Sequence, residues 1–393
     1  MHRAGVGSIG RCLATHRRQP GPAEGVAWTA NALQYGMTEI TLVLPFALPP
    51  PELAPDLVRA LQAPSLAALL SRTSSHRASA VDPGARALPH ELWLGCVLGL
   101  SDGRRLSVAA RAMRGYGQEP RDGTWFIVNP AHIEIARSHL LMADSRRLGL
   151  VESHSRALFD SAKPYFDETG NTLLYGDAQT WFMRADGWAD LDTASPDAAT
   201  GMNLTDWMPL GERALDYRKL QNEVQMLWHH HPANVEREAR GFGAINGFWP
   251  WGAASAAAPV AAAAGMPAPP QLACSGAPPW LAALAGRHAT SFAELLAATG
   301  RADTGRAEPG KEMLYYDGSL AEAALATDWA GWLQQMGRID ADLLTPLLGK
   351  LAGGGVGKLR LVLSHRSALA ELTTTPMAQR KFWRRPTLDR LLP

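Results

Sequence analysis

The sequence predicts an α/β protein: a core sheet flanked by helices, built from both ends of the chain, with an inserted α+β domain. Three observations predict this class. A strand followed by a helix lies at residues 40–72, and a helix followed by a strand lies at residues 339–363. The stretch between them mixes strands and helices. With 393 residues, the chain is also long enough for two domains.

The first elements are read from apolar runs. The run ITLVL at residues 40–44 predicts a buried strand. Leucines on one face predict a helix at residues 63–72, and residues 91–100 are apolar enough to be buried. Residues 124–135 read as a strand that turns at Pro130.

The middle of the chain alternates between helix and strand patterns. Residues 152–170 form an amphipathic pattern closed by a glycine, which predicts a helix. Residues 171–184 alternate like two strands joined by a turn at Gly176. Residues 212–230 give the clearest helical pattern, and we expect Pro232 to end that helix.

The last elements lead to a polar strand end. Residues 339–351 predict a helix with a kink at Pro346, and residues 358–363 predict a buried strand. The glycine-rich segment before that strand is not a phosphate loop, because the strand follows it and Leu359 replaces the required Ser or Thr. The strand ends in Ser364, His365 and Arg366.

Charge and composition exclude some partners. Lys and Arg number 38, Asp and Glu number 37, and the net charge is +1. A nucleic-acid binder needs a basic face, so we expect no nucleic acid partner. The basic cluster RKFWRR at residues 380–385 is interpreted as a solvated tail.

Cysteines and apolar runs indicate the compartment. The three cysteines are far apart in sequence and form no metal-binding spacing, so we expect reduced thiols in a cytoplasmic protein. The longest low-charge stretch is interrupted by proline and lacks large aliphatic residues, so we expect no membrane span and no membrane partner.

Domain boundaries follow from these patterns. We expect residues 37–130 and 273–393 to form the core, and residues 131–252 to form the inserted domain. Residues 253–272 are rich in alanine and proline and predict a linker or loop. Residues 1–36 lack the compact apolar run of a signal peptide, and we expect a disordered extension.

Three motifs have a functional interpretation as well as a structural one. Histidines 229–231 are adjacent, so a helix cannot direct all three at one ion, and capping of a helix end is the better interpretation. Residues 241–252 predict a buried strand and an aromatic loop, or a substrate loop that presents Asn246. Arg146 and Arg147 suit a carboxylate or phosphate, or form an exposed charged turn.

Several stretches, in this order, resemble the archaeal-type cofactor-independent phosphoglycerate mutases of the alkaline-phosphatase superfamily. The most specific is HPANVEREARGFGAINGFWPWG at residues 231–252. ADSRRLGLVE, SPDAATG and the first strand with its helix also resemble segments of that family. The middle helix KLQNEVQMLWHHHPAN and the ending QRKFWRR resemble bacterial RpfE-type regulatory proteins. The resemblance implies an alkaline-phosphatase-like core sheet.

The resemblance also implies a site from which this sequence departs. Active members hold two divalent metals with Asp and His side chains and use a nucleophilic hydroxyl. Here the first strand ends without an acid, Trp332 stands where the family has histidine, and Ser364 stands where it has an acid. Only His365 and Asp328 remain, which is too few ligands for two metals.

The leading expectation is therefore a phosphoglycerate mutase-like protein that has lost its metal site and acts as a cytoplasmic regulatory or ligand-binding protein. We expect no metal, no cofactor and no catalytic residue. The expected ligand is an anionic small molecule. The candidate ligand-binding residues are Arg146, Arg147, His231, Asn234, Asn246 and His365.

Two alternatives remain open. One is an active metal-dependent mutase or phosphohydrolase with a rearranged site that recruits Asp82, Asp317 or Asp328. The other is a protein-interaction scaffold whose aromatic loop at residues 248–251 docks a protein partner. Exposure of that loop favours docking, and burial favours packing.

Overall fold

The computed structural model places most of the chain. It describes residues 38–136, 139–256, 271–285, 292–294 and 312–393. The predicted extension, residues 1–36, lies outside the described residues, as does the centre of the predicted linker.

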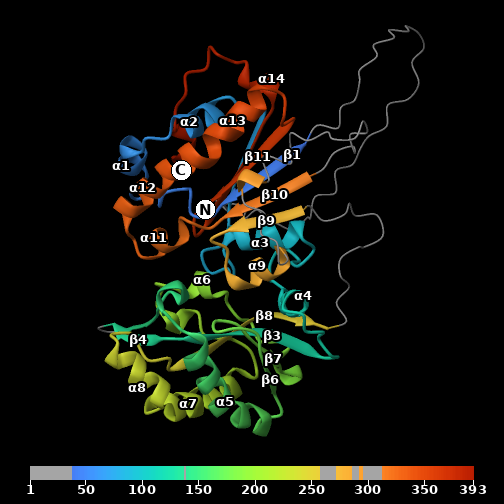
Figure 1. The fold of residues 1–393 in the computed structure, drawn as a ribbon, viewed down its shortest axis with the longest axis vertical. Helices are drawn as coiled ribbons and strands as arrows, with labels where there is room; N and C mark the ends of the chain where they lie inside the picture. Colours follow the sequence, from blue (N-terminus) through green and yellow to red (C-terminus); the bar gives the residue numbers. More distant parts are fainter. Residues whose placement is uncertain (1–37, 137–138, 257–270, 286–291, 295–311) are drawn as a thin grey trace, which may run out of the picture.

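A mixed six-stranded sheet forms the first unit (Figure 1). Its order is β2-β12-β11-β1-β10-β9; β11, β1, β10 and β9 pair in parallel, and β12 is antiparallel to both of its neighbours, β11 and β2. The strands come from both ends of the chain, which confirms the predicted core sheet. Their bounds are β1 (Glu39–Leu44), β2 (Ser75–Ala80), β9 (Gln271–Ser275), β10 (Glu312–Asp317), β11 (Lys358–Ser364) and β12 (Ala368–Thr374).

Helices flank this sheet. In Figure 1, α1, α2, α12 and α13 lie together on one side, and α3 and α9 lie between the sheet and the second unit. The predicted strand at residues 40–44 and the helix at 63–72 are confirmed by β1 and α2. The helices are α1 (Ala54–Ala60), α2 (Pro64–Ser71), α3 (Pro89–Val97), α9 (Pro279–Ala285), α11 (Ala321–Leu325), α12 (Trp329–Ile339), α13 (Thr345–Ala352) and α14 (Pro376–Gln379), with the turns η4 (Asp340–Leu344) and η5 (Asp389–Leu391).

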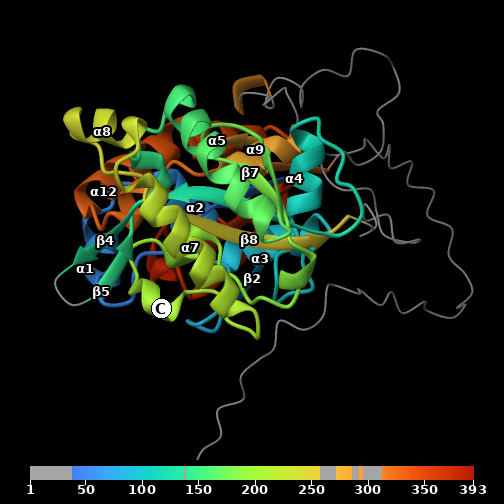
Figure 2. The same cartoon turned by 90° about the horizontal axis from the view of Figure 1, so that it is seen from below.

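An antiparallel four-stranded sheet forms the second unit, with the order β6-β7-β3-β8. Helices α5, α7 and α8 cover the face of this sheet that is turned away from the first unit (Figures 1 and 2). The strands are β3 (Thr124–Ala131), β6 (Thr172–Tyr175), β7 (Trp181–Arg184) and β8 (Gly247–Ser255), with the hairpin β4 (Ile133–Ala136) and β5 (His139–Met142). The helical elements are α4 (Ala109–Gly115), η1 (Ser145–Arg147), α5 (Glu152–Glu168), η2 (Asp186–Trp188), α6 (Pro196–Ala199), η3 (Leu204–Asp206), α7 (Ala214–His229) and α8 (Pro232–Ala239).

Aromatic side chains fill the core of the second unit. Trp181 and Trp228 are fully buried and meet edge to face with ring centroids 6.0 Å apart. Leu220 and Val224 of α7 pack into the same core, which confirms the predicted apolar face of that helix. The 3.6-residue spacing of apolar residues in the sequence of α7 therefore corresponds to a buried face of that helix.

Of two predicted breaks at proline, the one at Pro130 is wrong and the one at Pro232 is confirmed. Strand β3 continues through Pro130, because β7 pairs with it only as far as Val128 and leaves one side of the strand free. Helix α7 ends at His229, before Pro232, and Pro232 also begins α8, at a position where its missing N–H is harmless.

The aromatic segment is also corrected. Residues 248–251 belong to strand β8 and not to a tight loop, and Phe248, Trp249 and Trp251 are at most 2% exposed. Burial is the outcome that favours core packing over docking of a partner. Within the described part of the chain, no helix has both the length and the apolar character needed to cross a bilayer.

Candidate functional site

The parallel strands of the first sheet end toward the second unit. Strand β11 ends at Ser364, β10 ends at Asp317, and β1 is followed by Pro45 and Phe46. Polar side chains from α3, η1 and α6 meet them there. In open α/β sheets, ligands bind outside the carboxyl ends of the strands, so this edge is the first place to look for a site.

A buried serine–histidine pair closes the end of β11. The Ser364 Oγ lies 3.0 Å from His90 Nδ1 and accepts a hydrogen bond of 3.3 Å from the Phe46 N–H. Burial lowers the pKa of His90 to about 4, so the ring is neutral at physiological pH. Serine beside histidine resembles an activated nucleophile, but Ser364 and His90 are at most 2% exposed. The pair links the end of β11 and the segment after β1 to α3. Because both side chains are buried, a substrate cannot reach them.

Glu91 is the neighbouring buried acid. Its Oε2 accepts hydrogen bonds from the Ser195 Oγ at 2.6 Å and from the Leu88 N–H at 2.7 Å. Burial and the negative charge of Asp197 raise the pKa of Glu91 to about 8. The carboxyl group is therefore mostly protonated at neutral pH and ties α3 to the start of α6.

A bidentate ion pair lies next to this acid. Arg146 Nη1 and Nη2 donate to Asp197 Oδ1 and Oδ2 at 2.9 and 2.6 Å, and Nη1 also donates to Asp144 Oδ1 at 2.9 Å. Burial alone would raise the pKa of Asp197, but Arg146 lowers it below its ordinary value. Arg366 extends the network by donating to the carbonyl groups of Ala198 and Thr200. The network thus connects the end of β11 to the second unit.

The two buried titratable groups predict a pH dependence of stability. Between pH 4.5 and 8 the folded protein keeps the Glu91 proton that the unfolded chain has lost, so stability falls as pH rises. Between pH 4 and 6.5 the unfolded chain binds a proton at His90 that the folded protein does not, so stability rises with pH. The two effects nearly cancel up to pH 6.5.

Above pH 6.5 only the Glu91 effect remains. We expect the free energy of unfolding to fall by about 2 kcal/mol between pH 6.5 and 8. Urea unfolding at a series of pH values measures this, and the Glu91→Gln variant is expected to lose the fall because its amide does not titrate. A fall of the same size in the variant would contradict the assignment.

The acids near this edge do not fit a two-metal centre. Glu91 is hydrogen-bonded and protonated, and Asp197 is neutralised by Arg146. Asp317 accepts a hydrogen bond of 3.0 Å from the Ser319 N–H, and no described group of three His, Cys, Asp or Glu side chains is arranged to hold a metal ion. These engaged side chains therefore offer no ligand set for a pair of divalent ions.

The acids that a rearranged site would recruit are engaged in turns and caps. Asp82 accepts from the Gly84 N–H at 2.9 Å, and Asp328 caps α12 through the Gly331 N–H at 2.9 Å. Both are exposed, whereas Asp317 is buried at the end of β10. Each makes a local contact with its own loop.

The predicted arginine and histidine ligands lie in different settings. Arg146 is committed to two carboxylates, while the neighbouring Arg147 is exposed, with its Nε 3.9 Å from Glu322 Oε1. His365 follows β11, and its Nδ1 is buried without a hydrogen-bond partner among the described residues. Burial lowers the pKa of His365.

The motif at residues 231–252 holds the backbone of the second unit together. His231 caps α8 by accepting from the Ala233 N–H at 3.2 Å. Asn234 is buried and exchanges hydrogen bonds of 2.8 Å with the backbone of Ile245. Asn246 does the same with the backbone of Ile133 at 2.7 Å. A ligand role for the six predicted residues stays a prediction.

Arg237 is a buried cation that the sequence reading missed. It is 0% exposed and donates to the carbonyl groups of Leu148 at 2.7 Å, Gly149 at 3.4 Å and Gly243 at 3.0 Å. Its neighbours in sequence are charged, which is typical of an exposed helix face. No short-range pattern therefore marks it as internal.

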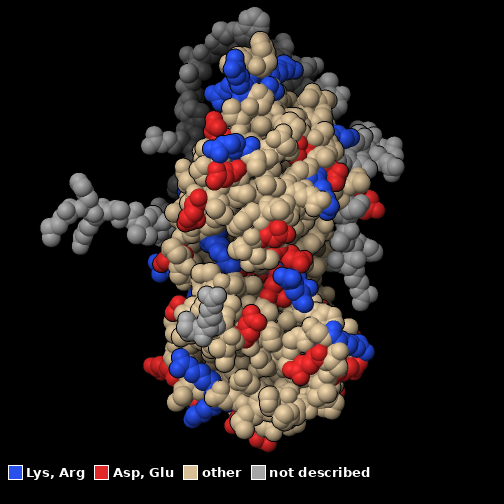
Figure 3. Space-filling view, turned by 90° about the vertical axis from the view of Figure 1, so that its left-hand side faces the viewer, with Lys and Arg blue, Asp and Glu red and all other residues tan. Residues whose placement is uncertain are grey.

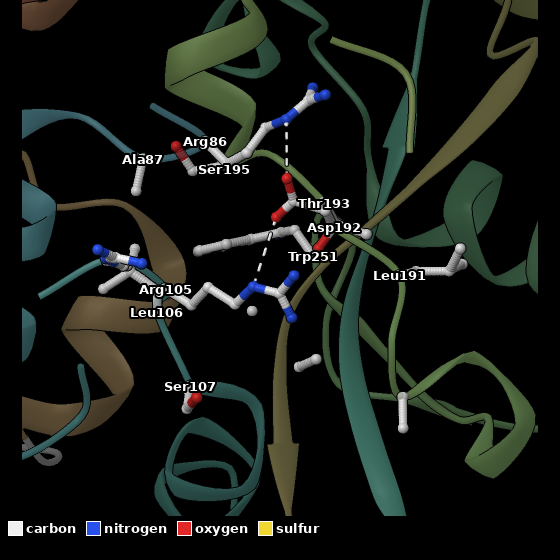
Figure 4. A pocket seen from close by; sticks show the side chains of 14 residues that line it. Arg86, Ala87, Arg105, Leu106, Ser107, Leu191, Asp192, Thr193, Ser195 and Trp251 are labelled. Carbon is white, nitrogen blue, oxygen red and sulfur yellow. Dashed lines mark ion pairs between the residues drawn. The ribbon is translucent and has the colours of Figure 1, made fainter. Parts of the chain in front are cut away.

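A pocket of about 180 Å³ lies between the two units (Figure 4). We call it the arginine pocket, because three arginine residues line it together with one acid, Asp192. Asp192 Oδ2 lies 3.5 Å from Arg86 Nε, and Asp192 Oδ1 lies 3.6 Å from Arg105 Nε (Figure 4). The lining residues are Arg86, Ala87, Arg104, Arg105, Leu106, Ser107, Ala189, Leu191, Asp192, Thr193, Ser195, Trp251, Gly252 and Ala253.

The lining of the arginine pocket carries an excess of positive charge. The Arg104 side chain makes no hydrogen bond or ion pair with any residue that the structure describes, and Asp192 is the only acid in the lining. The nearby Asp102 lies outside the lining, where it accepts 2.8 Å hydrogen bonds from the N–H groups of Arg104 and Arg105. An oxyanion entering the pocket would therefore find unmatched guanidinium groups.

A second pocket of about 330 Å³ lies behind Trp251, which lines both pockets. The charged residues in its lining are one cation, Arg146, and the acids Asp197 and Glu322; the third acid, Glu91, is protonated. This pocket has no excess positive charge. Charge therefore favours the smaller arginine pocket as the place for an anion.

Comparisons with known proteins give weak likenesses. No model of a protein family matches the sequence, and no curated protein does. The cofactor-independent phosphoglycerate mutase of Thermoplasma acidophilum DSM 1728 is 15% identical with a TM-score of 0.39, over 86% of this chain and 90% of that chain. The PH0037 protein of Pyrococcus horikoshii is 11% identical with a TM-score of 0.48, over 86% of this chain and 88% of that chain.

Proposed function

We propose that this chain is a cytoplasmic ligand-binding protein with a regulatory role, which holds a small oxyanion in the arginine pocket and does not use two-metal chemistry. One observation carries the proposal: Arg86, Arg104 and Arg105 line a pocket between the two units against the single carboxylate of Asp192. A phosphate or carboxylate group would supply the missing negative charge.

The guanidinium groups suit an oxyanion in geometry as well as in charge. Each presents paired N–H donors that match the oxygen spacing of phosphate and carboxylate. Arg86 is largely buried, donates to the Asp206 carbonyl at 3.2 Å and lies over Trp207 at 6.0 Å, so its position is held before a ligand arrives. The pocket volume of about 180 Å³ leaves room for a phosphate-sized group.

The walls of the pocket support a regulatory role. Arg86 precedes α3 of the first unit, and Arg104 and Arg105 lie on the connection from α3 to α4, whereas Asp192 and Trp251 belong to the second unit. An anion bound between them would favour the arrangement of the units that brings both walls together. Binding of the ligand would then change the relative arrangement of the two units.

Calorimetric titration with inorganic phosphate tests the site. The Arg105→Ala variant is expected to bind phosphate at least about tenfold more weakly, because a charged donor of the pocket is lost. Arg147→Ala is the matched control, since Arg147 is also exposed and also follows an Asp-x-Arg sequence but lies outside this pocket. Equal affinities for the wild type and Arg105→Ala would refute the site.

An enzyme assay separates binding from catalysis. The purified protein is incubated with 3-phosphoglycerate and manganese, and we expect no turnover because the acids at the strand ends are already engaged. Turnover that a chelator abolishes would support the alternative of an active enzyme with a rearranged site.

A further inference from the structure

A turn rich in cations and aromatics projects from the first unit. Residues 380–385 follow α14, and the side chains of Phe382 and Trp383 are 81% and 67% exposed. Their ring centroids are 5.3 Å apart at an interplanar angle of 81°. Large aromatic side chains are seldom so exposed, so this pair indicates an interaction surface.

The turn is anchored to the body of the protein. Lys381 Nζ donates to the Thr73 carbonyl at 3.4 Å, and Arg384 Nη1 donates to the Ser71 carbonyl at 3.3 Å. The Thr387 N–H donates to the Ser71 Oγ at 2.8 Å. Side chains and backbone are thus fixed on the connection between α2 and β2, and the two aromatics face outward from a defined platform.

Positive charge is concentrated around the aromatic pair. Residues 377–393 contain five cations against one acidic side chain, Asp389, while the whole chain has a net charge of only +1. None of the five forms an ion pair with a described residue. The end of the molecule near α14 accordingly shows a cluster of Lys and Arg in Figure 3. The five cations are Arg380, Lys381, Arg384, Arg385 and Arg390.

In place of the expected solvated tail without a membrane partner, we propose that this turn, which we call the cationic-aromatic turn, attaches the protein to the surface of an anionic lipid bilayer. Trp and Phe enter the interface between headgroups and acyl chains, and unpaired Lys and Arg bind anionic headgroups. A turn at the end of the molecule can reach a flat surface. The attachment is peripheral, and it does not depend on the arginine pocket.

The geometry of the pair favours lipid over nucleic acid. Successive bases stack on aromatic faces that are open and in line with the strand. Here the two rings meet nearly at right angles, so one ring edge covers part of the other face. A lipid interface requires only exposed apolar area next to cations, and both are present.

Sedimentation with vesicles tests the proposal. Wild-type protein is expected to bind vesicles of phosphatidylcholine and phosphatidylserine, and to bind phosphatidylcholine alone at least about tenfold more weakly. The double variant Phe382→Ser/Trp383→Ser is expected to lose at least about tenfold in binding to the anionic vesicles. High salt should weaken the wild-type binding.

A matched control distinguishes the turn from general exposed apolar surface. Met226 is 79% exposed on α7 of the second unit, and Met226→Ser should bind anionic vesicles like the wild type. Equal binding by the wild type and the double variant would overturn the proposal, and so would tight binding to a single-stranded oligonucleotide with none to vesicles. Urea unfolding of the double variant checks, independently of the arginine pocket, that the fold is intact.

Discussion

Replacing Arg146 with alanine is expected to lower the free energy of unfolding by about 3–5 kcal/mol, a large share of the total stability of a typical protein. The reason is that Asp197 and Asp144, both buried, lose the guanidinium group that neutralises them. A buried carboxylate without a partner is far more unfavourable than a buried pair. Urea unfolding followed by far-ultraviolet circular dichroism measures the effect.

The neighbouring residue provides the control. Arg147→Ala removes an exposed cation whose nearest acid is 3.9 Å away, so we expect a change within about 0.5 kcal/mol. A double variant, Arg146→Leu/Asp197→Leu, should recover part of the stability because no unpaired charge remains between these two positions. Equal, small effects of Arg146→Ala and Arg147→Ala would show that the buried pair contributes little.

Replacing Arg237 with alanine is expected to lower the free energy of unfolding by about 3–5 kcal/mol. Its guanidinium group serves the carbonyl groups of Leu148, Gly149 and Gly243, and these would lose their donor in the interior. The change should loosen the joint between α8 and the segment before α5. Hydrogen exchange at residues near that joint would rise together with the loss of stability.

Two further variants sharpen this test. Arg237→Lys should recover only part of the stability, because one ammonium group cannot reach three carbonyl groups in a fixed fork. Arg240→Ala removes an exposed helix cation paired with Glu236, and we expect an effect within about 0.5 kcal/mol. Full stability of Arg237→Ala would mean that water replaces the guanidinium group.

Short-range patterns were sufficient for the fold class. The apolar run at residues 40–44, the periodic helix at 212–230 and the strand at 358–363 are all observed, because burial of one face or one strand leaves a local signature. Proline was less informative. Pro130 lies inside a strand and Pro232 at a helix start, and both depend on neighbours that sequence spacing does not reveal.

The buried network at the strand ends could not be read from sequence. His90 and Ser364 are 274 residues apart, and Glu91 and Ser195 are 104 residues apart. His90 and Glu91 stand at the edge of an apolar run that predicted burial, but nothing local indicated their partners. Only the folded topology brings these four side chains together.

The arginine pocket, in contrast, had a local signal. The sequence Asp-x-Arg-Arg-Leu occurs twice, at residues 102–106 and 144–148, and only the second was recognised. In both copies the aspartate accepts hydrogen bonds from the following backbone. The copies differ in their surroundings, since Arg146 meets two buried carboxylates whereas Arg104 faces a pocket. Only in the first copy does a guanidinium group, that of Arg104, remain without a partner among the described residues.

On our proposal, an oxyanion binds in the arginine pocket and not at the closed strand ends. Soaking crystals in tungstate, a phosphate-like anion with strong anomalous scattering, tests it most directly. We expect an anomalous peak within hydrogen-bonding distance of the Arg104 and Arg105 side chains. A peak beside Arg147 or His365 alone, or no bound tungstate at all, would contradict it.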